Sequence, residues 1–264
     1  MMISKTAVLA LVLSLGGASF AQAQDAEELA KDLSNPVADL ISVPFQLNYD
    51  DNIGPDDGGS RWTLNIQPVI PFSLNDDWNL ISRTILPVVS TDGLPPGSGT
   101  HTGLADTVQS FFFSPKDTVG GGWIVGAGPA FLVPTSTDDR FGVGEWGAGV
   151  TGVVLRQSGP WTYGGLANHI WDVSGDTDIS STFMQPFMSY TTPEAWTFTL
   201  NSESTYDWES EEWSVPLNGV VTKVVQFGDQ PVSFGGGIRY WADPAPNGPE
   251  GWGARFIMTF LFPA

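Results

Sequence analysis

The chain has 264 residues, a formal net charge of −19 at pH 7 and no cysteine, and charged residues make up only 15% of it. Without cysteine there are no disulfides, thiolate metal sites or cysteine nucleophiles, and the acidic balance argues against nucleic acid as a partner. Few charges together with 11 tryptophans are atypical of a disordered chain.

The first 23 residues have the pattern of a secretory signal peptide. Lys5 precedes an apolar run over residues 7–15, and the small residues Ala21 and Ala23 follow it. This order predicts cleavage after Ala23, so residues 1–23 are interpreted as a cleaved signal peptide and the mature protein as exported. The apolar run is too short to cross a bilayer as a helix.

Residues 24–40 are predicted to form a short helical segment in the periplasm. Leu29, Leu33, Val37 and Leu40 recur near helical spacing. The pattern leaves open whether this segment closes the mouth of the structure that follows it or lies beside that structure.

From residue 41 onward, turn signals separate twelve runs with strand character. The runs are 41–49, 61–72, 77–88, 105–114, 122–133, 145–156, 161–171, 181–191, 195–207, 212–226, 231–241 and 251–262. No stretch in this part approaches 18 consecutive apolar residues, which excludes membrane-spanning helices. Short connections alternate with longer, more acidic ones, as in an outer-membrane barrel whose termini are both periplasmic. Residues 41–264 are therefore predicted to form a twelve-stranded antiparallel transmembrane β-barrel, an all-β fold.

The last run indicates which solvent each face of the wall meets. At a period of two, Phe256, Met258, Phe260 and Phe262 share a wholly apolar face, and Arg255 lies on the opposite one. The tryptophans all lie at or near the ends of runs, and indole rings favour the membrane–water interface. They predict two aromatic girdles, with the apolar face of the wall against lipid.

Several long blocks of the sequence resemble a known family. They include SNPVADLISVPFQLNYDDNIGP, RWTLNIQPVIPFSLNDDWNLISRTILPVV, WTYGGLANHIWDVSGD, FMQPFMSYTT, FTLNSESTYDWE and QPVSFGGGIRYWADPAPNGPEGWGARFIMTFLFP. In this order, from Ser34 to Pro263, they are similar to the bacterial outer-membrane barrel family linked to the meta-pathway of phenol degradation. The resemblance implies a transporter or porin-like barrel associated with aromatic compounds. It carries no catalytic or ligand-binding motif over to this chain.

The candidate functional residues are those that the alternation turns inward. Charged residues are rare in the predicted strands, so inward Arg83, Arg239, Arg255 and Glu203 predict a narrow, charged constriction of the lumen. An inward set of amides completes the polar lining: Gln46, Asn48, Asn65, Gln67, Asn201 and Asn218. The alternative is that arginine and carboxylate pair and plug the barrel.

No enzymatic or metal-binding pattern is evident. In lipolytic twelve-stranded barrels a serine follows the histidine by two residues, whereas here Gly103 follows His101 and Trp171 follows His169. Neither paired carboxylates nor a metal-ligand spacing stands out, so no catalytic activity, cofactor or metal is predicted.

The predicted function is passive uptake of small molecules across a Gram-negative outer membrane, with hydrophobic or aromatic compounds favoured by the resemblance. A non-conducting structural or adhesion barrel is the first alternative, and a lipolytic barrel enzyme the second. The expected partners are outer-membrane lipids, lipopolysaccharide bridged by divalent cations to the acidic loops, the barrel-assembly machinery and the small-molecule permeant.

Overall fold

The computed structural model describes residues 25–175 and 177–262. The predicted signal peptide lies outside the described residues. A helix over residues 25–33 is followed by fifteen β segments. The segments are β1 (Ile41–Ile53), β2 (Gly59–Ile66), β3 (Val69–Ser73), β4 (Trp78–Asp92), β5 (His101–Leu104), β6 (Thr107–Pro115), β7 (Trp123–Val133), β8 (Gly147–Ser158), β9 (Trp161–Asp172), β10 (Ser180–Thr191), β11 (Trp196–Ser202), β12 (Ser204–Asp207), β13 (Glu212–Phe227), β14 (Gln230–Asp243) and β15 (Gly251–Phe262).

Three of the strands are broken, and each break separates two segments of one strand. Both β2 and β3 pair with β1 and β4, both β5 and β6 pair with β4, and both β11 and β12 pair with β10 and β13. Pro68 lies in the first break, where it cannot donate a backbone hydrogen bond, and Glu203 is the single residue of the third. The segments therefore make twelve strands, which confirms the predicted number.

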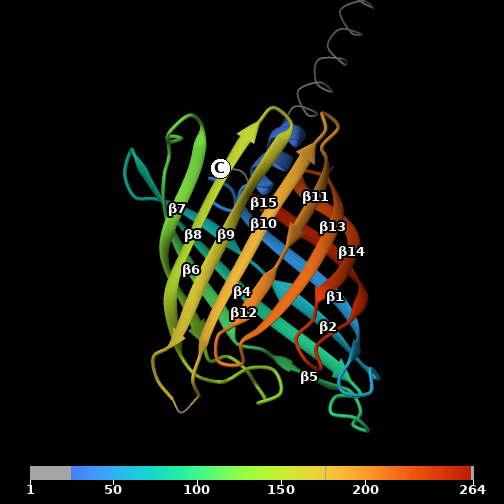
Figure 1. Cartoon of the computed structure of the whole chain (residues 1–264). Helices are drawn as coiled ribbons and strands as arrows, with labels where there is room; N and C mark the ends of the chain where they lie inside the picture. The colour runs from blue at the N-terminus through green and yellow to red at the C-terminus, as the bar shows by residue number, and fades with distance from the viewer. Residues whose placement is uncertain (1–24, 176, 263–264) are drawn as a thin grey trace, which may run out of the picture.

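The sheet closes on itself. β15 pairs antiparallel with β1, from Ile41 opposite Phe262 to Tyr49 opposite Ala254. Every neighbouring pair around the wall is antiparallel, and Figure 1 shows the resulting tilted barrel. A closed sheet has no unpaired edge, so all strand backbone groups can be satisfied within a membrane. None of the helices in the described part of the chain is long and apolar enough to cross a membrane.

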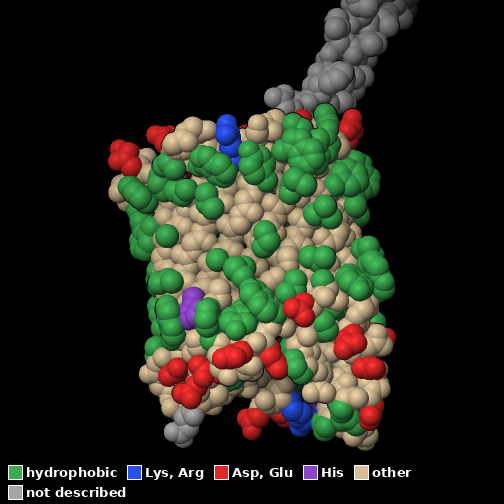
Figure 2. Space-filling model, viewed as in Figure 1, with side chains coloured by type: hydrophobic (Ala, Val, Ile, Leu, Met, Phe, Trp, Pro, Cys, Tyr) green, Lys and Arg blue, Asp and Glu red, His purple; other side chains and the backbone are tan. Residues whose placement is uncertain are grey.

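The two ends of the barrel differ. At one end, here called the turn end, the connections are short, and Gly159 and Gly228 adopt positive φ values of 57° and 63° in tight turns. At the other, the loop end, the connections include residues 93–100 and 134–146. The N-terminal helix and the end of β15 lie at the turn end (Figure 1). Acidic side chains gather toward the loop end on the face that Figure 2 shows.

Side chains alternate between the outside of the wall and the lumen as the sequence predicts. In β15, Phe256 is 55% exposed on the outer face, whereas Arg255 is 1% exposed and points inward. Nine of the eleven tryptophans are among the exposed large side chains. Trp241 is an exception to the predicted girdles, because it is buried and donates a hydrogen bond to Asp50 in the lumen.

The outward position of Phe256 can be tested by substitution. Phe256→Arg is expected to destabilise the barrel by about 2–4 kcal/mol, because it places a guanidinium against hydrocarbon near the middle of a strand. Urea unfolding of the protein in lipid vesicles measures this difference. Phe256→Leu is the matched control and should cost much less. Equal destabilisation by the two substitutions would contradict the lipid-facing assignment.

The N-terminal segment packs inside the turn end of the barrel. Ala30, Ala38 and Leu40 are buried in one cluster with Val224 and Leu261, whose side chains face the lumen. The side chain of Gln157 also donates a hydrogen bond of 2.9 Å to the backbone oxygen of Lys31. The sequence leaves open whether this segment closes the mouth of the barrel or lies beside it. In the structure it lies within the mouth.

Candidate functional site

Three cavities within the lumen meet at one residue. Their volumes are about 510 Å³ at the loop end, 350 Å³ in the middle and 230 Å³ at the turn end. Glu203 lines all three cavities. It lies where β11 ends and β12 begins, so its side chain reaches the axis of the barrel from a break in the wall.

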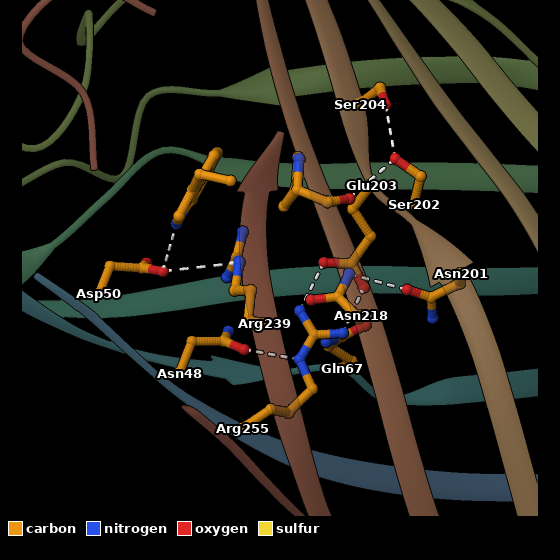
Figure 3. A network of polar contacts seen from close by, with 12 residues as sticks. Asn48, Asp50, Gln67, Asn201, Ser202, Glu203, Ser204, Asn218, Arg239 and Arg255 are labelled. Carbon is orange, nitrogen blue, oxygen red and sulfur yellow. Dashed lines mark hydrogen bonds and ion pairs between the residues drawn. The ribbon is translucent and has the colours of Figure 1, made fainter. Parts of the chain in front are cut away.

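Glu203 and Arg255 form the central ion pair of the lumen (Figure 3). The guanidinium donates two hydrogen bonds to the carboxylate, of 2.8 Å from Nη1 and 2.6 Å from Nη2. Its Nε donates a third, of 2.7 Å, to Oδ1 of Asn48. The two-point geometry fits the planar fork of arginine and fixes both side chains. The break between β11 and β12 is thus linked across the lumen to the neighbouring strands β15 and β1.

A second charged group lies nearer the loop end and is centred on Asp50. Nη2 of Arg61 lies 3.4 Å from Oδ2 of this carboxylate, and Nε of Arg239 lies 3.5 Å from Oδ1. Trp241 donates a hydrogen bond of 2.9 Å to the same Oδ1. The guanidinium of Arg239 also stacks over the Trp241 ring, 4.5 Å from its centroid.

The remaining predicted residues also face the lumen. Arg83 donates a hydrogen bond of 3.3 Å to Gln67, and Asn218 donates one of 2.8 Å to Asn201. Gln46 and Asn65 line the middle cavity. The structure thus brings the ten predicted residues to one lumen but divides the charged ones, because Arg255 contacts Glu203 whereas Arg239 contacts Asp50.

Three residues of this site were missing from the sequence prediction. Asp50 follows the predicted run 41–49 and so falls in a connection, but β1 runs to Ile53 and turns this carboxylate inward. Arg61 and Trp241 were placed only at the ends of runs. The period-two alternation identifies all three: Arg61 and Trp241 share the inward parity of Asn65 and Arg239 within their predicted runs, and Asp50 shares that of Asn48 one step past its run.

The other half of the lumen wall is apolar at the turn end. Val37, from the N-terminal segment, is buried against side chains of β4, β6, β8 and β9, namely Ile81, Phe112, Val153, Leu155 and Leu166. Phe183 and Phe187 of β10 pack against the same cluster. An apolar wall of this kind is unlike the water-filled interior of a general porin, which is polar.

Outside the lumen, His169 lies beside two tryptophans, Trp171 and Trp208. His169 stacks against Trp171 with ring centroids 4.1 Å apart, and its Nδ1 lies 2.6 Å from the hydroxyl of Thr182. Trp208 donates a hydrogen bond to the same hydroxyl. This arrangement suits a polar residue at the membrane interface. Within residues 25–175 and 177–262, no group of three or more His, Asp or Glu side chains could hold a metal ion.

Comparison with known proteins bears on the fold. No family model matches the chain, and neither does any curated protein. Among solved structures, the COG4313 outer membrane channel from Pseudomonas putida F1 is similar, with a TM-score of 0.64 and 14% identity over 84% of this chain and 94% of that one. The NanC porin covers 85% of this chain and 100% of its own at 11% identity. Outer membrane phospholipase A from Escherichia coli covers 85% and 98% at 9% identity.

The NanC porin and the phospholipase each have a TM-score of 0.49, so neither is a guide to the activity of this chain. At 14% identity, the likeness to the Pseudomonas channel shows the fold alone. The family linked to phenol degradation is not shown by these comparisons and stays a prediction. The closed antiparallel wall makes the chain a twelve-stranded β-barrel, and its fold is similar to that of a known outer membrane channel.

Proposed function

We propose that the chain is a porin-like channel that passes small molecules across the bacterial outer membrane, with compounds that are partly hydrophobic or aromatic as its favoured class. The observation that carries this proposal is the two-sided lumen. One side bears the charged groups of Asp50 and Glu203, and the other presents the apolar side chains of Ile85, Leu132 and Phe183 to the middle cavity. A permeant with both polar and apolar parts can exchange water for contacts on both sides.

The loop end is taken to face the outside of the cell and the turn end the periplasm, as in outer-membrane barrels generally. Acidic side chains at the loop end would then lie beside the phosphates of lipopolysaccharide (Figure 2). Divalent cations have the oxygen-ligand preference needed to bridge the two. Assembly by the barrel-assembly machinery is part of the same proposal.

A non-conducting structural barrel is the second candidate. It is favoured by the N-terminal segment, which fills part of the turn-end mouth through Ala38 and Leu40. The two candidates differ in whether a solute can pass this segment.

Single-channel recording in planar bilayers distinguishes the candidates. The purified protein is first shown to be folded by its heat-modifiability, that is, by a gel mobility that changes when the sample is boiled. A channel is then expected to give unitary currents of small conductance, because the Glu203–Arg255 pair narrows the lumen. Vesicle swelling with neutral aromatic solutes then tests passage of the favoured class. Silence in bilayers together with no swelling would exclude the channel. Release of fatty acid from phospholipid vesicles by the pure protein would favour the lipolytic alternative.

A further inference from the structure

We propose that the loop-end cavity binds a small monocarboxylate with an apolar body, and that Arg61 and Arg239 hold its carboxylate. The cavity measures about 510 Å³ and is reached from the loop end, where residues of the loop 134–146 line it. The inference rests on the proposed function in one respect, since it names the class of molecule that the channel would take up.

The cavity holds an excess of positive charge although the whole protein is strongly acidic. Its charged lining consists of Asp50, Arg61, Arg140, Glu203 and Arg239. Glu203 is bound at both oxygens by Arg255, and Arg140 by Asp138 in the same two-point manner. What remains is two guanidiniums against the one carboxylate of Asp50. One further negative charge would balance the group.

The two arginines also have unused hydrogen-bonding capacity. Nε of Arg61 and Nε of Arg239 are both buried and make no hydrogen bond within the described residues, although Nε of Arg239 lies 3.5 Å from Oδ1 of Asp50. Arg239 is only 8% exposed, and its contacts to Asp50 and to the ring of Trp241 hold it in place. A buried charged donor without an acceptor is costly. A carboxylate of a ligand is an acceptor that satisfies both charge and hydrogen bonding.

The rest of the cavity wall favours an apolar body on the ligand. Leu94, Pro95 and Phe141 come from the loops, and Pro87 and Val89 from β4. The uncharged polar side chains of the lining, Asn48, Thr63, Asn65 and Thr91, lie on β1, β2 and β4, so the apolar body is expected to contact the loop residues. A single excess positive charge matches a monocarboxylate better than a doubly charged phosphate. Asp50 competes with the ligand for the same guanidiniums, which keeps binding weak enough for release into the middle cavity.

The test is calorimetric titration of the folded, detergent-solubilised protein with benzoate, against a blank of detergent alone. Saturable binding of benzoate is expected, with benzyl alcohol and benzylamine showing none, because they have the same ring without the negative charge. Arg239→Gln should weaken benzoate binding about tenfold or more. Arg156→Gln removes an arginine that does not line the cavity and is the matched control. It should leave the affinity unchanged.

Asp50→Asn is expected to raise the affinity for benzoate, whereas Arg239→Gln lowers it. It removes the competing carboxylate, so benzoate should bind more tightly than to the unaltered protein. Heat-modifiability on gels shows that each variant is folded, and Arg61→Gln replaces Arg239→Gln if the latter fails to fold. Equal binding of benzoate and benzyl alcohol, or no binding of either, would overturn the proposal.

Binding of benzoate does not require conduction, so the proposed site and the proposed channel can be refuted independently of each other. Benzoate binding by a protein that is silent in bilayers would retain the site and remove the channel. Unitary currents from a protein that does not bind benzoate would retain the channel and remove the site.

Discussion

Glu203→Gln is expected to destabilise the barrel by about 3–5 kcal/mol, because it leaves a buried guanidinium without its counter-charge. Arg255 is 1% exposed, and two of its three side-chain hydrogen bonds end on this carboxylate. The substituted amide presents an N–H₂ group toward the guanidinium, where an oxygen is needed. Urea unfolding in lipid vesicles measures this change in the free energy of unfolding. The folded fraction is monitored on gels as the band of the unboiled, folded form.

Two further variants separate loss of the pair from loss of a carboxylate. Glu194→Gln makes the same chemical change at an exposed turn residue and should leave stability unaltered. The double variant Glu203→Gln with Arg255→Met removes both charges, and it should recover much of the lost stability because no unpaired ion is left buried. If the single variant were as stable as the unaltered protein, the pair would not be a structural element of the lumen.

Deletion of residues 25–37 is expected to raise the unitary conductance severalfold. These residues include the helix and Val37, which is buried in the apolar cluster of the lumen wall. Their removal joins the turn-end cavity to the mouth of the barrel, and the wider water path conducts more ions. The deletion retains Ala38 and Leu40, whose packing against Leu261 helps to hold the start of β1. Planar-bilayer recording of the refolded variant is the measurement.

The matched control for this deletion is Val37→Ala in the full chain. It removes two methyl groups from the cluster and leaves the helix in the mouth, so conductance should change little. Heat-modifiability must be retained in both variants. Unaltered conductance after the deletion would show that the N-terminal segment does not limit the flow of ions.

The number of strands and the direction of their side chains could be predicted from the sequence, because both are local properties of a strand. Successive side chains point to opposite faces whatever the rest of the fold does. Phe256 and Arg255 could thus be assigned to lipid and lumen from their positions alone. The same rule placed Arg239 inward. Asp50 was missed because the predicted strand ended at residue 49, and Trp241 because the tryptophans at the ends of runs were assigned to the interfacial girdles.

Which inward residues meet could not be predicted in this way. Glu203 and Arg255 are separated by 52 positions, and they pair because strand tilt and stagger bring the break in one wall opposite β15. The stagger belongs to the closed sheet as a whole, through the register of β1 with β15. The placement of Val37 is of the same kind, because a helical spacing shows an apolar face but not what covers it. Sequence by itself determined the barrel and the faces of its wall, whereas closure of the sheet decided the ion pairs, the cavities and the position of the N-terminal segment.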